Sequence, residues 1–311
     1  MKQLRNTAHR LFRALPLVCL ALTGCATVHL DTTPLVRTYP AAFGALTSVA
    51  DRQDGSLRIM TLNIAHGRGD SFHQLLQGTA TTRKNLDNIT TLLHESDAHV
   101  VALQEADGPS FWSGNFSHID YLASNGAYSQ SVHGSHANGL GLSYGTALMA
   151  RLDLRNPQAI TFDPDLSPVP KGFVVSTVSW PGQPGVEVDI VSLHLDFASV
   201  SNRKNQAQEL IDTLRHRQRP LVVTGDFNSE WAENSTVQHI CQALALTAWR
   251  PKSPGLATFP SSGERLDWIL VSKGIAFRTY QVIPDNVSDH RGVLAELTLA
   301  PGTTTRIARA D

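Results

Sequence analysis

Short apolar runs recur along the chain from Leu57 onward, and they predict β-strands. The last of them places Val293, Ala295, Leu297 and Leu299 at every second position, as expected of a strand with one buried face. Six such runs lie at residues 57–65, 99–105, 186–196, 219–229, 265–272 and 292–299. Several of these runs begin or end at a residue with a charged or amide side chain.

Two other segments repeat their apolar residues every three or four positions, which predicts amphipathic helices. In the segment 83–95 the apolar face is formed by Leu86, Ile89, Leu92 and Leu93. In the segment 203–217 it is formed by Ala207, Leu210, Ile211 and Leu214. Strands and helices interleave, but strands also follow one another in pairs. This order favours a layered α/β fold with mixed sheets over a purely parallel one.

Residues 106–145 show neither period and are rich in Gly, Ser, His and aromatic residues. We interpret this stretch as a long, loop-dominated insertion, a kind of segment that is uncommon unless it serves a function. Replacement of Asp107, near its start, is expected to have little effect.

The N-terminus has the pattern of an export signal. Four cations precede a nine-residue apolar segment, which is too short to span a bilayer as a helix. The ending "LTGC" resembles a bacterial lipobox and predicts cleavage before a lipidated Cys25. Cleavage a few residues later, by an ordinary signal peptidase, is the alternative. Because Ala26 rather than Asp follows Cys25, we expect an outer-membrane lipoprotein of the cell envelope.

Four regions follow from these patterns. Residues 1–24 are the predicted signal peptide, and residues 25–55 the lipidated N-terminus and a tether with little pattern. Residues 56–301 form the predicted domain, and residues 302–311 a C-terminal tail.

Charge and cysteine content narrow the function classes. The chain has 26 basic and 27 acidic residues; without residues 1–24 it keeps 22 basic residues and a net charge of −5. No long basic run is present, which weakens the case for a protein that clamps duplex nucleic acid through its phosphates. Only Cys241 would remain unmodified in the mature chain, so no intrachain disulfide is expected. Cys241 lies on an apolar helical face and is expected to be a buried core residue.

Polar residues capable of chemistry recur at the ends of the predicted strands. Each has a structural alternative: Asn63 as a turn cap, Glu105 or Asp267 as half of an ion pair, His194 as a satisfied core histidine. If these ends converge, they form a cluster of oxygen ligands and imidazoles. Such a site suits magnesium or manganese rather than zinc and fits attack of water on phosphorus. The residues at strand ends are Asn63, Glu105, His194, Asp226, Asn228, Asp267, Asp289 and His290.

Six segments in this order resemble the endonuclease/exonuclease/phosphatase superfamily of metal-dependent hydrolases. They are "TLNIAHGRG", "ALQEAD", "SLHLD", "GDFNS", "RLDWI" and "SDHRGVLAEL", and the resemblance covers about residues 57–299. The resemblance implies an α/β fold, a four-layer αββα sandwich with two mixed β-sheets packed face to face, and a site at one rim.

The resemblance also implies which residues bind metal. Asn63 and Glu105 would coordinate a catalytic Mg²⁺, with Mn²⁺ as a substitute, and Asp289 would bind a second or shifting ion.

Thr146 lies in "YGTALMAR", at a position where relatives often have an amide or carboxylate. A hydroxyl there can still bond a phosphate oxygen, although less rigidly.

The remaining roles concern water and phosphate. Asp226 would orient or deprotonate the attacking water, and Asn228 would hold a phosphate oxygen and Asp226. His290 would contact the phosphoryl group, Asp267 would orient its ring, and His194 would stabilise phosphate oxygens or assist the leaving group. Strand alternation predicts that Asp226 and Asn228 point the same way.

The substrate class stays open at this level, because members of one fold act on different molecules. The leading hypothesis is a phosphodiesterase or phosphatase attached to the membrane by its N-terminal lipid, acting on a small molecule, a lipid headgroup or nucleic acid. The alternatives are an envelope-associated nuclease and a non-catalytic binding module. No obligate protein partner is implied.

Overall fold

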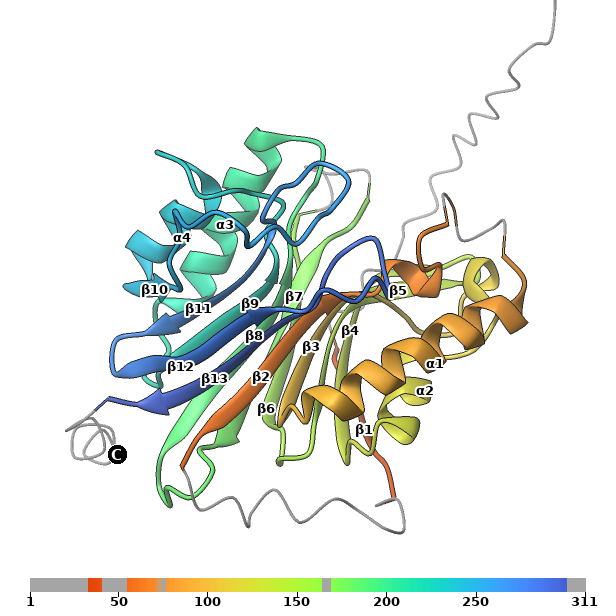
Figure 1. The fold of residues 1–311 in the computed structure, drawn as a ribbon, viewed down its shortest axis with the longest axis horizontal. Helices are drawn as coiled ribbons and strands as arrows, with labels where there is room; N and C mark the ends of the chain where they lie inside the picture. The colour runs from red at the N-terminus through yellow and green to blue at the C-terminus, as the bar shows by residue number, and fades with distance from the viewer. Residues whose placement is uncertain (1–32, 41–54, 72, 74–76, 164–168, 301–311) are drawn as a thin grey trace, which may run out of the picture.

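The structure, a computed structural model, describes residues 33–40, 55–71, 73, 77–163 and 169–300. Two β-sheets lie face to face at its centre, and helices cover the outer face of each (Figure 1). The four-layer αββα sandwich predicted from the sequence is confirmed. The predicted signal peptide, with Cys25, and the C-terminal tail fall outside the described residues.

The first sheet has seven strands and mixes parallel with antiparallel pairs. In spatial order its strands are β1 (Leu35–Thr38), β4 (Gln130–Gly139), β5 (Leu142–Ala150), β3 (Val100–Asp107), β2 (Leu57–Asn63), β13 (Val293–Leu299) and β12 (Ile275–Val282). Two helices cover its outer face, α1 (Thr79–Ser96) and α2 (His118–Asn125).

The second sheet has six strands and is also mixed. In spatial order its strands are β10 (Leu246–Ala248), β11 (Asp267–Ser272), β9 (Leu221–Asp226), β8 (Glu187–His194), β7 (Gly172–Ser179) and β6 (Arg155–Thr161). Helices α3 (Val200–Leu214) and α4 (Thr236–Ala243) cover it. Two 3₁₀ turns complete the elements used below, η2 (Ala65–Gly67) and η4 (Phe111–Ser113).

Apolar side chains fill the three spaces between the layers. Ile59, Val100 and Ile269 belong to the cluster between the sheets, and Leu86 of α1 and Leu210 of α3 belong to the outer two. These are the faces that the sequence periodicity predicted. Cys241 is buried in the layer beneath α4 as a free thiol, as expected.

Two segments differ from the sequence-based interpretation. Residues 106–145, expected to be loop-dominated, contain η4, α2, β4 and the start of β5. The sequence pattern did not predict strand β4 because its buried positions include the polar residues His133 and His136, so no apolar alternation marks it. Within the predicted tether, Leu35–Thr38 forms β1 and pairs antiparallel with β4. Among the described residues, no helix is long and apolar enough to cross a membrane.

The directions of the strands bring the ends that carry the predicted site residues to one edge of the sandwich. The parallel pairs β2–β3 and β8–β9 end at the same edge of the sandwich, where the antiparallel strands β13 and β11 begin. The register places Asp226 beside His194 on one side and beside Asp267 on the other. Gly225 is required just before this point, since a Cβ there would lie 2.0 Å from the backbone oxygen of Leu193.

Candidate active site

A cleft of about 470 Å³ opens at this shared edge. Seven of the eight predicted site residues line it: Asn63, Glu105, His194, Asp226, Asn228, Asp289 and His290. The eighth, Asp267, lies directly behind His290. The structure therefore brings together residues that are up to 227 positions apart in the sequence, from Asn63 to His290.

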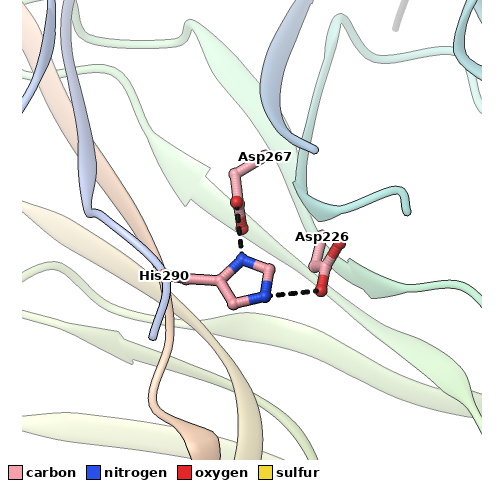
Figure 2. Close-up of side chains that lie close together, drawn as sticks. All are labelled: Asp226, Asp267 and His290. Carbon is pink, nitrogen blue, oxygen red and sulfur yellow. Dashed lines mark hydrogen bonds and ion pairs between the residues drawn. The ribbon is translucent and has the colours of Figure 1, made fainter. Parts of the chain in front are cut away.

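The clearest arrangement in the cleft is an imidazole held between two carboxylates (Figure 2). The Nδ1 atom of His290 lies 2.8 Å from Oδ2 of Asp267, and its Nε2 atom lies 3.7 Å from Oδ2 of Asp226. All three side chains are almost fully buried, Asp267 completely. The ring of Phe259 packs against the imidazole, with the centroids 4.8 Å apart.

This arrangement fixes the charge of the groups involved. Burial alone would lower the pKa of His290, but the carboxylates of Asp267 and Asp226 outweigh it and raise the pKa to about 10. Burial raises the pKa of Asp226 to about 6, although the charge of His290 opposes the shift. At neutral pH His290 is thus a cation, and Asp226 has an affinity for protons well above that of an ordinary aspartate.

Thr258, which no sequence motif marked, connects the two loops that carry this arrangement. Its buried hydroxyl accepts hydrogen bonds from the backbone N–H groups of Leu266 and Asp267, both at 3.0 Å. Its carbonyl accepts one from the N–H of Arg291 at 2.7 Å. Thr258 therefore ties the start of β11 to the residue that follows His290.

Asp226 is held on both of its oxygens. Its Oδ2 accepts a hydrogen bond from Nδ2 of Asn63 at 3.0 Å, and its Oδ1 accepts one from the backbone N–H of Asn228 at 2.9 Å. Phe227 is buried, as alternation predicted. Asn228 is not part of the strand, however: it adopts a left-handed backbone with φ +47°, and its side chain donates to the carbonyl of Leu195. A tight turn, not alternation, brings it to the cleft.

Glu105 reaches the cleft through an irregularity in β3. The pairing of β3 with β5 shifts register between Leu103 and Ala106, and Glu105 has a left-handed φ of +48°. Such a bulge redirects one side chain, and the strained backbone is typical of functional positions. Burial opposes ionisation of Glu105, but His66 at 3.4 Å and Lys171 at 3.8 Å outweigh burial and lower its pKa.

Asp289 is less buried and has a cationic partner. Its carboxylate pairs with the guanidinium of Arg68, which also donates to the carbonyl of Ser71. Arg68 lines the cleft as well. A metal ion bound by Asp289 would therefore compete with an arginine.

The donor set fits a hard divalent ion. Asn63, Glu105 and Asp289 offer only oxygen atoms to the cleft, and the amide oxygen of Asn63 keeps a lone pair beyond the one that accepts from the N–H of Ala65. The second cluster of possible ligands, Asp226, Asp267 and His290, has atoms within 4.8 Å of one another. An ion there would have to replace the proton that His290 shares with Asp267.

His194 has an unexpected neighbour. Lys171 directly precedes β7. Its ammonium lies 3.0 Å from Nε2 and 3.2 Å from Nδ1 of the His194 ring. Burial holds the pKa of His194 well below its usual value, and Lys171 adds to the effect. Nothing in the sequence pattern marked Lys171, since it lies outside all six family motifs.

Behind Glu105 lies a polar cluster that was also missed. Asp107 is fully buried and bonds Nδ1 of His66 at 2.7 Å and Nε1 of Trp112 at 2.8 Å. The ring of His66 contacts Trp112 and Tyr144. Asp107 thus orients His66, which in turn faces Glu105, and this burial argues against the expectation that its replacement has little effect.

Thr146 does not face the cleft. It is fully buried, and its hydroxyl bonds Nε2 of His136 at 2.8 Å. His136 also bonds Thr161 of the second sheet at 3.1 Å, so this pair connects the two sheets. A contact between Thr146 and a phosphate is therefore not supported.

Comparison with known proteins identifies the family. A sequence model of the endonuclease/exonuclease/phosphatase family matches residues 60–290, about three quarters of the chain. The chain therefore belongs to the endonuclease/exonuclease/phosphatase family, whose members are typically metal-dependent phosphoester hydrolases. The match includes every site residue described above. No curated protein sequence matches significantly.

Solved structures show the same fold at low sequence identity. An endonuclease/exonuclease/phosphatase from Beutenbergia cavernae is 20% identical, with a TM-score of 0.62 over 79% of this chain and 72% of that one. One from Bacteroides vulgatus is 17% identical, with a TM-score of 0.60 over 79% and 99%. TDP2 from D. rerio, in complex with a single-strand DNA product, is 15% identical, with a TM-score of 0.58 over 79% and 100%. At such identities the likeness establishes the fold alone.

Proposed function

We propose that this protein hydrolyses phosphoester bonds with the help of a divalent metal ion, Mg²⁺ or Mn²⁺. The observation that carries the proposal is the pairing of cationic His290 with Asp226 and Asp267 beside an oxygen-only donor set. A non-catalytic binding module would have no need of a carboxylate with a pKa of about 6 beside such a cation.

Each residue has a role that follows from its surroundings. Asp226, held by Asn63 and Asn228, orients the attacking water and accepts its proton. His290 places a positive charge where phosphate oxygens gain negative charge, and Asp267 keeps its ring in place. A metal ion held by Asn63, Glu105 and Asp289 would supply further positive charge to the phosphate.

One panel of assays tests this proposal. The purified protein is offered an activated phosphodiester, an activated phosphomonoester, sphingomyelin, phospholipids, inositol phosphates and DNA, with Mg²⁺, with Mn²⁺ and with a chelator. We expect metal-dependent turnover of at least one substrate, abolished by His290→Gln. Full activity in exhaustive chelator, or rescue by zinc alone, would contradict it.

A nuclease is the second candidate, and one observation favours it. Phe197 lines the cleft with 64% of its surface exposed, and Arg203 lies beside it. An exposed aromatic ring next to a cation is suited to stacking a nucleobase and holding its phosphate. The similar TDP2 structure carries a single-strand DNA product. Phe197→Ala should then weaken cleavage of a single-stranded oligonucleotide but spare the activated phosphodiester. Phe111→Ala, a change at an exposed phenylalanine outside the cleft, should change neither.

We also propose that residues 1–24 are removed and that lipidated Cys25 anchors the protein in the bacterial outer membrane. The support is the sequence "LTGC" at the end of the apolar segment, followed by Ala26. Fractionation of cells should find the wild-type protein in the outer membrane and Cys25→Ser in the soluble fraction. A soluble wild-type protein would refute the anchor without touching the hydrolase proposal.

A further inference from the structure

The edge of the sandwich that carries the cleft also carries exposed apolar side chains on both of its flanks. Phe197 and Val200 lie on the flank of the second sheet, just after β8, and Phe111 and Leu140 lie on the flank of the first. The two other strongly exposed large apolar side chains among the described residues both belong to β1. Single exposed apolar residues are normal, but a group of them at one edge marks a surface that contacts another body.

Leu140 buries little of its surface and has a strained backbone. It occupies the turn between β4 and β5, is 86% exposed and has a left-handed φ of +52°. Such a turn favours glycine or asparagine, because a larger side chain is strained there. Phe111, 54% exposed, lies against the same turn, and its N–H donates to the carbonyl of Gly141 at 3.0 Å. Phe111 and Leu140 thus form an apolar tip whose side chains contribute little to the fold.

The segments that form the two flanks carry no Asp, Glu, Lys or Arg. None occurs in residues 108–119 or 121–150 on the first flank, and none occurs in residues 197–202 on the second. A surface without charges can leave water without desolvating an ion. A nucleic acid, by contrast, is bound largely through cations that contact its phosphates. The apolar tip therefore fits the uncharged interior of a lipid layer better than it fits a polyanion.

The direction of β1 indicates where the proposed lipid anchor lies. Strand β4 runs toward the cleft edge and ends there at Gly139, and β1 is antiparallel to it, with Leu35 beside His133. The chain therefore enters β1 from the cleft edge. Cys25 precedes Leu35 by ten positions, and ten residues span at most about 35 Å. A lipid on Cys25 would thus favour an orientation in which the cleft edge, not the opposite edge, is near the membrane.

We propose that the cleft edge docks on the membrane surface, with the apolar tip of Phe111 and Leu140 inserted among the lipids. Two apolar side chains bind a bilayer only weakly by themselves, but a tether makes their insertion an intramolecular step. The inference rests on the proposed function for one consequence, that the cleft meets phosphoesters presented by the membrane.

A fluorescent label tests the insertion without any substrate. Leu140→Cys, in the protein as cells produce it, is labelled with the environment-sensitive dye NBD and reconstituted in vesicles of phosphatidylethanolamine and phosphatidylglycerol. Cys241 is buried and Cys25 would carry the lipid, so the dye reacts at position 140. We expect a blue-shifted emission that a quencher attached to lipid chains reduces. The matched control is Lys273→Cys, at an exposed position that follows β11 at the opposite edge, where the dye should stay in water.

Hydrolysis should separate a membrane substrate from a soluble one. The double variant Phe111→Ser with Leu140→Ser should lower the turnover of a phosphoester lipid in vesicles by on the order of tenfold or more, because two apolar side chains no longer leave water on docking. Turnover of the soluble activated phosphodiester should not change, since neither residue lines the cleft. Both side chains are exposed, so the variant should melt like the wild type.

The outcomes separate docking from hydrolysis. An unshifted label at position 140 would overturn the inference, as would an equal shift at position 273, which would indicate adsorption without orientation. If the protein carries no lipid, the vesicles are added to the soluble protein and the same two results decide. Loss of oligonucleotide cleavage by the double variant without vesicles would assign the apolar tip to nucleic acid and also overturn the inference. If the label inserts but no phosphoester is hydrolysed, the docking stands and the proposed function fails.

Discussion

Asp226 and Asp267 share one rigidly held imidazole, whereas Glu105 and Asp289, elsewhere on the cleft, face the ends of long cationic side chains. The first two carboxylates are 2% exposed or less and are bonded to His290, Asn63 and backbone groups. Glu105 and Asp289 are 22% and 27% exposed, and their partners include Lys171 and Arg68.

The difference indicates that the two parts of the site are prepared in different ways. The Asp226–His290–Asp267 group is complete from the protein's own residues, so its geometry exists before substrate arrives. The pair of Glu105 and Asp289 is balanced by lysine and arginine, which a metal ion would replace as the positive charge. Changes to the Asp226–His290–Asp267 group should therefore affect the chemical step. Changes to Glu105 or Asp289 should affect how much metal is needed.

The largest effect is expected from substitutions in the Asp226–His290–Asp267 group. Asp226→Asn removes the proton acceptor, and His290→Gln removes the cation. Each should lower kcat by roughly a hundred- to ten-thousandfold. Thermal melting followed by circular dichroism should show both variants folded. Near-wild-type turnover in either folded variant would mean that the reaction occurs elsewhere.

A smaller effect is expected from Glu105→Gln, which keeps the shape of the side chain but removes its charge. The Mg²⁺ concentration for half-maximal activity should rise by about tenfold or more, because a neutral amide is a weaker ligand. Activity titrated with metal, together with calorimetry, measures the shift. Glu230→Gln, a change at an exposed glutamate outside the cleft, is the control and should leave the titration unaltered.

Arg68→Gln should move the metal titration in the opposite direction. It frees Asp289 from its cation, so the half-saturating Mg²⁺ concentration should fall by about two- to fivefold, the range of a partly exposed ion pair worth up to about 1 kcal/mol. Arg203→Gln removes a charge from the same cleft without touching Asp289 and should not tighten metal binding. An equal effect of both variants would show that general electrostatics, not the Asp289 pair, sets the affinity.

A separate effect concerns stability and pH in the absence of metal. The pKa of His290 rises from its model-peptide value of 6.5 to about 10 on folding, so the folded state binds the proton more tightly. The stability that His290 contributes is fully present below pH 6.5, declines above it and is lost as the pH passes about 10. Urea unfolding of the wild type and of His290→Gln at several pH values measures this as a shrinking difference. A difference that is independent of pH would contradict the predicted charge of His290.

Much of the fold was predictable because its signals are local. Alternation and helical periodicity identified β13, α1 and α3, and the ends of apolar runs marked seven of the residues that line the cleft. Where burial involves polar groups, local pattern fails. Strand β4 went undetected, since His136 is buried by bonding Thr146 and Thr161 rather than by being apolar.

The sequence by itself determined the family, the layered α/β fold and the chemical kinds of group at the strand ends, because each of these depends on residue type and spacing. Only the tertiary structure decided how those groups are paired. The bulge that turns Glu105 into the cleft, the burial of Asp107 beneath His66, and the approach of Lys171 to His194 all join segments distant in the chain. Contacts of that kind join polar side chains near the strand ends, and such contacts leave no periodic pattern in the sequence.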